Sequence, residues 1–336
     1  MKNILITGGA GFIGSALIIK LLENGHNVIA IDNINSYYDQ KLKIDRINHI
    51  EETNINRKSS FKFYKLSISD KSALTNLFES NNFDTVVHLA AQAGVRHSID
   101  NPDVYFHSNL LGFGNVIEEI RRNNVSNFIF ASSSSVYGGN EDLPFKESHI
   151  VDTPVSLYAA TKKSNELMAY SYSHLYGIPT TGLRFFTVYG PWGRPDMAPM
   201  KFTKAILEGR KIKVFNFGKM KRDFTYIDDV VEGILKCCFK PATSNKVSNN
   251  LFNSAPYRIF NLGNGQPVEL MDFINILENS LGIKSKKEFI KMQQGDVVQT
   301  WANTSSLSEW IGYSPKTSIK DGVDKFTRWY KEYYGF

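Results

Sequence analysis

The chain has 336 residues, 42% of them hydrophobic, and a formal net charge of +6. This length and apolar content allow a large buried core, either as two domains or as one large α/β domain with a smaller lobe. The charge is mild and dispersed, apart from a denser cluster between Lys201 and Lys221, whereas nucleic-acid binding requires a concentrated basic face. We therefore expect no nucleic-acid partner. No apolar run reaches the roughly 18 residues that a membrane span needs, so we expect no membrane partner either.

The first apolar segment, Ile4-Leu5-Ile6, is followed by the glycines Gly8 and Gly9. A secretory signal peptide needs a longer apolar stretch and a small-residue cleavage site, so we expect a buried strand here and a cytoplasmic protein. The two cysteines, Cys237 and Cys238, are neighbours, and neither a disulfide nor a metal site fits that spacing. We therefore expect two core residues on a helix and no bound metal.

The first half of the chain alternates short apolar runs with helical patterns. Strands are expected at 4–6, 28–31, 61–64, 85–89 and 128–131, and helices at 12–21, near 70–80, at 103–123 and at about 156–176. This alternation predicts a doubly wound parallel sheet of the Rossmann type. Glycine and proline become frequent after Gly190, which favours a smaller C-terminal α/β lobe. We expect domains at 1–189 and mainly 190–336, with segments near 224–262 returning to the first domain and a surface loop at 242–257.

A glycine-rich segment, Gly8-Gly9-Ala10-Gly11-Phe12-Ile13-Gly14, follows the first strand and opens the first helix. Its spacing fits G-x-G-x-x-G and the related G-x-x-G-x-x-G form. Glycines permit a tight turn and a close approach of the backbone to a pyrophosphate, and the helix N-terminus supplies free N–H groups to the phosphates. The motif alone is weak, but its position in a strand–turn–helix unit predicts a dinucleotide site.

Asp32 ends the second predicted strand, 18 residues after Gly14. A carboxylate at this point accepts hydrogen bonds from the adenosine ribose hydroxyls and repels a 2′-phosphate, so NAD is favoured over NADP. A solvated aspartate without a ligand is the alternative interpretation.

Tyr158 and Lys162 are four residues apart and are expected on one face of the long helix. A nearby ammonium lowers the pKa of a phenol, and a tyrosine base working near pH 7 needs a shift of roughly three units from its usual value near 10. Tyr37 and Lys41 have the same spacing, but they follow the second strand, beside the adenosine, where a redox base has no use. The sequence therefore favours Tyr158 as the base.

Four serines, 132–135, end the fifth predicted strand, and ligands of such sheets bind at the carboxyl ends of the strands. A serine there can donate a hydrogen bond to a substrate hydroxyl. A simple polar turn is the alternative interpretation, which the nearby Tyr158, Lys162 and glycine loop make less favourable.

Five segments of the chain together resemble the extended short-chain dehydrogenase/reductase family, nearly end to end. The segments are 89–96 (LAAQAGVR), 132–138 (SSSSVYG), 158–162 (YAATK), 183–197 (LRFFTVYGPWGRPDM) and 222–229 (RDFTYIDD). Within the family the sequence most closely resembles the UDP-glucuronate 4-epimerases, which interconvert UDP-glucuronate and UDP-galacturonate through a 4-keto intermediate. The resemblance implies a Rossmann NAD-binding domain, a UDP-sugar-binding lobe, and a homodimer formed through the helices near 103–123 and 156–176.

The resemblance also implies roles for particular residues. The implied catalytic residues are Ser133, Tyr158 and Lys162. The implied NAD-binding residues are Gly8, Gly11, Phe12, Ile13, Gly14, Asp32, Asn33, Ser67, Ile68, Leu89, Ala90, Ala91, Asn109, Tyr158, Lys162 and Phe186. The implied substrate-binding residues are Arg96, Ser133, Ser134, Ser135, Thr187, Arg194, Phe215, Arg222 and Asp296. Alternatives are a surface charge for Arg222, a turn or cap for Asp296 and a core position for Phe215. Arg96 is equally consistent with a ligand contact and a solvated charge.

The residues after Ser133 distinguish the reactions of the family. Members resembling 4,6-dehydratases have an Asp-Glu pair where this chain has Ser134 and Ser135, and decarboxylases have a glutamate at the position of Ser135. Serine hydroxyls cannot act as an acid/base pair at neutral pH. Galactose-type epimerases have an asparagine where Thr187 stands, and hydroxyls there, with Arg194, suit a sugar carboxylate. We therefore expect an epimerase for UDP-glucuronate, with suppression of CO₂ loss as a second role of the hydroxyls.

Two positions depart from the family pattern. Ser67 stands where an aspartate usually contacts adenine, and Ser133 stands where close relatives often have threonine. The alternatives to the leading interpretation are a UDP-hexose or UDP-N-acetylhexosamine 4-epimerase, a 4-keto product-former such as a UDP-glucuronate decarboxylase, and a non-catalytic NAD-sensing Rossmann protein. The last class usually lacks the tyrosine–lysine pair that this chain retains.

Overall fold

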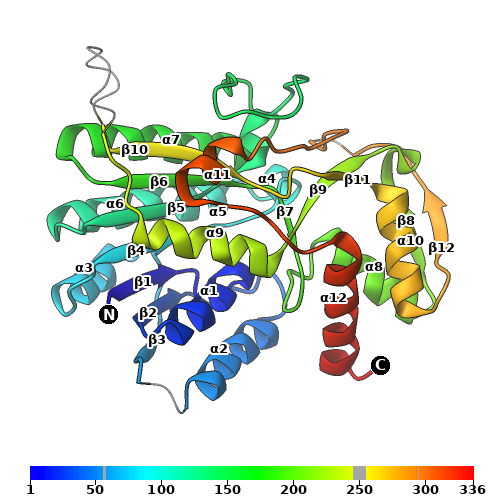
Figure 1. Ribbon diagram of the computed structural model, residues 1–336, viewed down its shortest axis with the longest axis horizontal. Coiled ribbons are helices and arrows are strands. Elements are labelled where there is room, and N and C mark those ends of the chain that lie inside the picture. Colours follow the sequence, from blue (N-terminus) through cyan, green and yellow to red (C-terminus); the bar gives the residue numbers. More distant parts are fainter. Residues whose placement is uncertain (56–57, 245–254, 294) are drawn as a thin grey trace. The chain divides into compact units, whose positions relative to one another are not determined.

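A computed structural model describes residues 1–55, 58–244, 255–293 and 295–336 (Figure 1). The chain forms two compact units, each assembled from three segments. Unit 1 consists of Met1–Asn140, Ile150–Arg184 and Val231–Phe260, and unit 2 consists of Glu141–His149, Phe185–Val230 and Asn261–Phe336. Among the described residues, no helix is both long and apolar enough to cross a membrane.

A seven-stranded sheet forms the centre of unit 1, in the order β10-β6-β5-β4-β1-β2-β3. The strands are β1 Asn3–Thr7, β2 Asn27–Asp32, β3 Phe61–Lys65, β4 Thr85–His88, β5 Asn127–Ser133, β6 Thr180–Phe185 and β10 Tyr257–Leu262. The pairings from β3 through β5 are parallel. The order of the strands reverses between β1 and β4, which creates the switch point where open α/β sheets bind ligands. The predicted Rossmann sheet is confirmed.

Helices connect these strands in unit 1. They are α1 Phe12–Glu23, α2 Gln40–Asn54, α3 Lys71–Glu79, α4 His97–Asp100, α5 Asp103–Tyr105, η1 Phe106–Leu111, α6 Gly112–Arg122, η2 Ser134–Tyr137, α7 Leu157–Tyr176 and α9 Ile227–Phe239, of which α9 begins in unit 2. In α6 the buried apolar residues stand at 113, 116, 117 and 120, and this spacing of three and four places them on one face. That face packs on the sheet.

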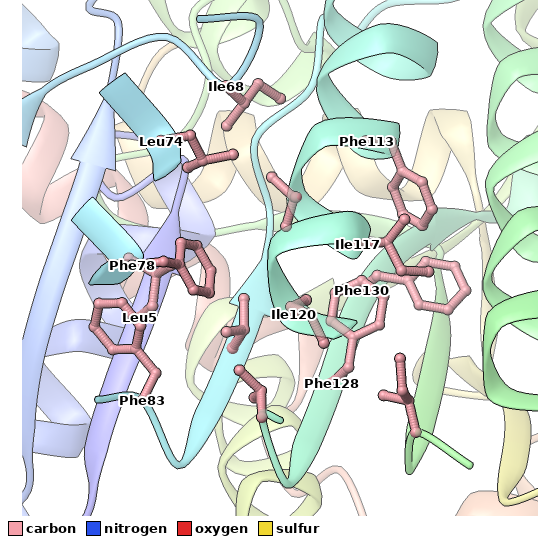
Figure 2. Packing of buried hydrophobic residues seen from close by; sticks show 14 of the residues in the cluster. Leu5, Ile68, Leu74, Phe78, Phe83, Phe113, Ile117, Ile120, Phe128 and Phe130 are labelled. Atoms are coloured by element: carbon pink, nitrogen blue, oxygen red, sulfur yellow. The ribbon is translucent and has the colours of Figure 1, made fainter. Parts of the chain in front are cut away.

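The apolar core beneath α3 and α6 is rich in aromatic side chains (Figure 2). Phe128 and Phe130 are two residues apart and therefore lie on the same face of β5, where their rings stack with centroids 5.6 Å apart. Phe113 of α6 meets Phe130 edge-on, also at 5.6 Å. Each fully buried ring contributes roughly 1.5–3 kcal/mol by leaving water, so this cluster holds β5 and the residues at its end firmly in the sheet.

The helix predicted at 103–123 is instead three consecutive pieces, α5, η1 and α6, of which η1 is a π-helix. A π turn inserts an extra residue and changes which side chains face inward, and such turns are frequent at functional sites. It contains Asn109, whose buried amide donates to the Gln92 carbonyl (3.0 Å) and to Thr161 Oγ1 (3.0 Å). These bonds account for the inward orientation of Asn109.

The sequence did not predict α2. Its interior positions include two buried charged residues, Lys43 and Arg46, where an amphipathic pattern would have apolar ones. The helix is defined at its start by Asp39, whose carboxylate accepts a hydrogen bond from the Lys41 N–H at 2.9 Å.

Unit 2 contains two small sheets and their helices. Its elements are β7 Thr187–Tyr189, α8 Ala198–Leu207, β8 Lys211–Val214, η3 Phe215–Gly218, β9 Lys221–Tyr226, β11 Pro267–Glu269, α10 Leu270–Leu281, β12 Lys286–Phe289, α11 Ser305–Ile311 and α12 Ile319–Tyr334. The sheets have the orders β11-β9-β7 and β12-β8. Phe224 of β9 stacks on Phe273 of α10 with centroids 4.4 Å apart, which joins the larger sheet to that helix.

Two smaller sequence predictions concern α9 and the segment after it. Cys237 and Cys238 are free and buried on α9, as predicted. Burial raises the pKa of the Cys237 thiol to about 12 and that of the Cys238 thiol still further. Most of the loop predicted at 242–257 lies outside the described residues.

Candidate active site

The glycine segment forms a tight turn between β1 and α1. Gly8 has φ +75°, and the Gly11 N–H donates to the Gly8 carbonyl at 3.0 Å. A Cβ on Gly14 would lie 2.2 Å from the Gly8 oxygen, and a Cβ on Gly8 would lie 2.7 Å from the Ala90 nitrogen. Only glycine fits at these positions. Helix α1 begins directly after Gly11 without a side-chain cap, so its first N–H groups suit a pyrophosphate.

Asp32 lies at the carboxyl end of β2, beside this turn. Its carboxylate accepts hydrogen bonds from the Ala10 N–H (3.2 Å) and from the Ile34 N–H (2.9 Å). Burial raises the pKa of the carboxyl, while the two N–H donors and the charges of Lys43 and Arg46 act to lower it. The group is therefore held in a fixed orientation, as a ribose-binding carboxylate requires.

Several other residues predicted to bind the cofactor lie at the same edge of the sheet. Ser67 and Ile68 follow β3, and Leu89, Ala90 and Ala91 follow β4. Because β1 to β4 run parallel, their carboxyl ends share this edge with the glycine turn and with Asp32. The residues present thus fit a dinucleotide.

Ser133 is the last residue of β5 and Tyr158 is the second residue of α7. The Ser133 hydroxyl donates to Ser135 Oγ and accepts from the Ser135 N–H, both at 3.1 Å. The Tyr158 N–H donates to Ser98 Oγ at 3.2 Å, and its ring meets Tyr105 edge-on with centroids 6.2 Å apart. Tyr158 stays partly exposed, as a base that must reach a substrate requires.

Lys162 follows one turn after Tyr158 and is 2% exposed. Its Nζ donates to the carbonyl of Ala131 in β5 at 2.9 Å, which ties α7 to the strand that ends in Ser133. Burial lowers the pKa of Lys162 to about 8. Burial, with the charge of Lys162 adding to it, lowers the pKa of His88 to about 3, so His88 is neutral and bonds Thr7 Oγ1 at 2.8 Å.

The buried ammonium of Lys162 makes a stability prediction possible. Its pKa is about 8 in the folded chain against a usual 10.5, so charging it inside the fold costs about 3 kcal/mol. This cost is fully present below pH 8 and disappears as the pH rises towards 10.5. Lys162→Met removes the cost and loses the bond to Ala131, so its free energy of unfolding should exceed the parent's by about 2 kcal/mol at pH 7.

Urea unfolding at pH 7 and at pH 10 tests this expectation, with Lys204→Met on α8 as the control. The advantage of the Lys162 variant should shrink at the higher pH, and an advantage of the same size at both pH values would contradict it.

The structure also shows a buried charge network that the sequence analysis missed. Glu166 of α7 receives two hydrogen bonds from Arg184 of β6, at 2.8 and 2.9 Å, and one from Ser132 Oγ at 2.6 Å. All three side chains are buried. The network joins α7, β5 and β6 next to Ser133. The one local signal was the spacing of Glu166, four residues after Lys162 on the same helix face.

The predicted substrate residues of unit 2 lie on β7, β9 and η3 and in two connecting segments. Thr187 begins β7, and Arg194, in the segment after it, forms a bidentate pair with Asp196 at 3.0 and 2.5 Å. Arg222 of β9 donates to the carbonyls of Val297 (2.7 Å) and Val298 (3.0 Å), next to Asp296. The structure thus brings Arg222 and the Asp296 segment together.

Phe215, Phe186, Arg96 and Asn33 are four more of the predicted residues. Phe215 begins η3 and is partly buried, Phe186 is buried between β6 and β7, and Arg96 is exposed directly before α4. Asn33 follows Asp32 and is exposed, and its side chain accepts from the Asn35 N–H at 3.1 Å.

Asp223, next to Arg222, is a second residue that the sequence analysis missed. Its buried carboxylate accepts hydrogen bonds from the N–H groups of Asn264 (2.7 Å), Gly265 (2.9 Å) and Ala302 (3.0 Å). Burial raises the pKa of this carboxyl, and the N–H donors oppose the rise. Asp223 therefore ties two chain segments, at 264–265 and at 302, to β9.

A Rossmann sheet with a glycine turn at its switch point, a fixed carboxylate after β2 and a serine–tyrosine–lysine set after β5 defines an enzyme that uses a dinucleotide to oxidise an alcohol. The model of the NAD dependent epimerase/dehydratase family matches residues 4–263, and the chain belongs to this family.

Relatives and solved structures are similar over almost the whole chain. Protein CapI of Staphylococcus aureus is 52% identical over 337 residues, covering 99% of each chain. The probable UDP-glucuronate 4-epimerase of Rhizobium meliloti is 44% identical, covering 98% of this chain and 97% of the relative. The crystal structure of UDP-glucuronic acid 4-epimerase from Bacillus cereus in complex with UDP-glucuronic acid and NAD superposes with a TM-score of 0.87 at 33% identity, covering 99% of this chain and 100% of that one.

Proposed function

We propose that this protein is a UDP-glucuronate 4-epimerase, which interconverts UDP-glucuronate and UDP-galacturonate with bound NAD. The observation that carries the proposal is the set of hydroxyls at the end of β5. Ser133, Ser134 and Ser135 lie where β5 passes into η2, and both elements contact α7, which carries the partly exposed Tyr158 and the buried Lys162. None of these residues is a carboxylate that could drive a second reaction at the sugar. The similarity to UDP-glucuronate 4-epimerases over nearly the whole chain supports the same substrate.

In this reaction Tyr158 takes the proton of the sugar 4-hydroxyl while the C4–H bond breaks, which leaves a 4-keto sugar. NAD, when held at the glycine turn and Asp32, would supply the hydride acceptor for C4 and the hydride donor for its return. The positive charge of Lys162, one turn from Tyr158, favours the phenolate form of the base. The hydroxyl of Ser133 donates to the substrate oxygen and keeps it oriented. After the 4-keto sugar turns over in the site, Tyr158 returns the proton and the alcohol has the opposite configuration.

Roles for the residues of unit 2 remain proposals. Arg222 suits the diphosphate and Asp296 suits the uridine ribose. The hydrogen bonds from Arg222 to the carbonyls of Val297 and Val298 hold the two residues near each other. Phe215 is assigned to the uracil ring. Arg194 supplies positive charge for the sugar carboxylate or the diphosphate, in exchange for part of its pairing with Asp196.

The assay that tests the proposal is incubation of the purified protein with UDP-glucuronate without added NAD. We expect UDP-galacturonate to form, with no net NADH and no CO₂. Equimolar CO₂ with a UDP-pentose would identify a decarboxylase, and conversion of UDP-glucose or UDP-N-acetylglucosamine but not of UDP-glucuronate would identify a different epimerase. Absence of any turnover, even with added NAD, would favour a sensor.

The hydroxyl of Ser135 is expected to restrain the sugar carboxylate during the 4-keto stage. A 4-keto uronate is a β-keto acid and loses CO₂ readily, and a carboxylate held by hydrogen bonds in a fixed orientation resists that loss. Ser135→Ala should therefore release UDP-pentose and CO₂, which we expect to be absent from the parent's products, and should weaken uronate binding by about the value of one charged hydrogen bond. Product chromatography measures the by-product and titration with UDP-glucuronate measures the affinity, with Ser80→Ala at the exposed C-terminal cap of α3 as the control. Unchanged by-product and affinity would remove this role.

We also propose a cytoplasmic homodimer that pairs through the α5–η1–α6 segment and α7. Apolar side chains on these helices support the surface, since Leu111 is 51% exposed, Leu167 59% and Leu175 64%. Analytical ultracentrifugation should give a mass twice that of the 38.0 kDa chain, and Leu167→Glu should lower the measured mass to that of one chain.

A further inference from the structure

Arg46 of α2 is among the most deeply buried large side chains in the described part of the protein, at 1% exposed. Its Nη1 donates to the Ala10 carbonyl at 3.0 Å and to the Tyr38 hydroxyl at 2.8 Å. The guanidinium carbon also lies 5.6 Å from the centre of the Tyr38 ring. Arg46 therefore reaches from the second helix of unit 1 to the middle of the glycine turn.

The same short segment of backbone receives Asp32. The Ala10 N–H donates to Asp32 while the Ala10 carbonyl accepts from Arg46, so the peptide groups on both sides of Ala10 are held by side chains of opposite charge. The charge of Arg46 lowers the pKa of Asp32 against the effect of burial. One cation thus fixes the turn directly and favours the ionised form of the neighbouring carboxylate.

Lys43 adds a second buried cation on the same helix. Its Nζ donates to the carbonyl (2.9 Å) and the side-chain oxygen (2.7 Å) of Asn35, and it lies 4.6 Å from the centre of the Tyr38 ring. The segment after β2 is thereby tied to α2 from two sides. The Tyr38 ring contacts both cations.

Stability alone does not account for this arrangement. Moving a guanidinium out of water costs several kcal/mol, and apolar residues of similar volume often serve a core as well or better. An arginine at this buried position instead fixes the conformation of what it bonds. Its partners are Ala10, in the turn after β1, and Tyr38, in the segment after β2. Both follow strands whose carboxyl ends lie at the predicted cofactor edge.

We propose that Arg46 and Tyr38 are positioning residues for the cofactor. They hold the glycine turn and Asp32 in the arrangement that accepts the adenosine and pyrophosphate of a dinucleotide, and tight retention of NAD between turnovers depends on them. The proposal rests on the proposed NAD site, but it concerns cofactor binding and not the choice of sugar.

The test compares Arg46→Met with the parent protein and with Arg210→Met, an exposed arginine paired with Glu208. NAD released by denaturing the purified protein is quantified, and NAD binding to stripped protein is titrated. Loss of the charged hydrogen bonds to the Ala10 carbonyl and to Tyr38 should weaken NAD binding about 10-fold or more. Added NAD should restore turnover of UDP-glucuronate with an unchanged KM for the sugar, and Arg210→Met should resemble the parent.

NAD content and affinity equal to the parent's in Arg46→Met would overturn the proposal, as would a loss of turnover that saturating NAD cannot restore in a folded variant. Tyr38→Phe decides the matter if Arg46→Met does not fold, because it removes one hydroxyl and keeps both cations. It should weaken NAD binding a few-fold, and parent-like affinity would overturn the proposal. If NAD binding responds as expected while the parent protein turns over no UDP-sugar, the proposed reaction fails and this inference stands.

Discussion

Tyr158→Phe should lower kcat by about 100- to 10,000-fold, the usual contribution of a positioned general base. Phenylalanine keeps the edge-on contact with the Tyr105 ring and the backbone bond to Ser98, so the change removes one hydroxyl and little else. The NAD content should stay at the parent level, because the loss affects the proton transfer and not the glycine turn. Rates of UDP-galacturonate formation, with NAD released on denaturation as the second measurement, test this.

Tyr170→Phe is the matched control, since it removes a hydroxyl from the same helix at a residue that is 36% exposed. It should turn over at the parent rate. Turnover by Tyr158→Phe within a few-fold of the parent would show that another group takes the proton, and the proposed mechanism would then be wrong.

Glu166→Ala should lower the free energy of unfolding by about 3–5 kcal/mol, the largest stability effect that we expect from a single substitution in this chain. It leaves the buried guanidinium of Arg184 without its bidentate carboxylate. Arg184 Nη1 already has no hydrogen-bond partner among the described residues, and the guanidinium carbon lies 4.9 Å from the centre of the Tyr137 ring. Urea unfolding followed by circular dichroism measures the loss.

Two further variants separate the unpaired charge from simple loss of packing. Glu166→Leu combined with Arg184→Leu should recover most of the stability, because apolar residues often replace a buried ion pair without cost. Glu232→Ala, which breaks an exposed pair with Lys236, should cost about 0–1 kcal/mol. A loss in Glu166→Ala no greater than in Glu232→Ala would show that the network carries little energy.

The features that were predictable from the sequence are those encoded by neighbouring residues. The glycine spacing at 8–14 lies within one turn, and the apolar runs of β1, β2, β4 and β5 are continuous because these strands are buried on both faces. The pairing of Tyr158 with Lys162 depends only on helical spacing. The class of the sheet, parallel and doubly wound, followed from the alternation of strands and helices.

The features that were missed depend on residues far apart in the chain. Arg46 meets Ala10 across 36 positions, and Arg184 meets Glu166 across 18, and no local pattern encodes either meeting. The helix α2 was not predicted because two of its buried positions hold charged residues, whereas the periodicity of an amphipathic helix is recognised from apolar residues at buried positions. In the π turn η1, the side chain of Asn109 likewise bonds a loop and a helix that are distant from it in sequence.

The two thiols of α9 have a practical consequence for experiments on this enzyme. Thiolates are the form that alkylating reagents attack, and both Cys237 and Cys238 are buried with their pKa raised well above neutral pH. We therefore expect neither thiol to react with maleimide dyes in the native protein. A single cysteine placed at the surface would carry a fluorophore or spin label at one known position, without first removing the two that are already there.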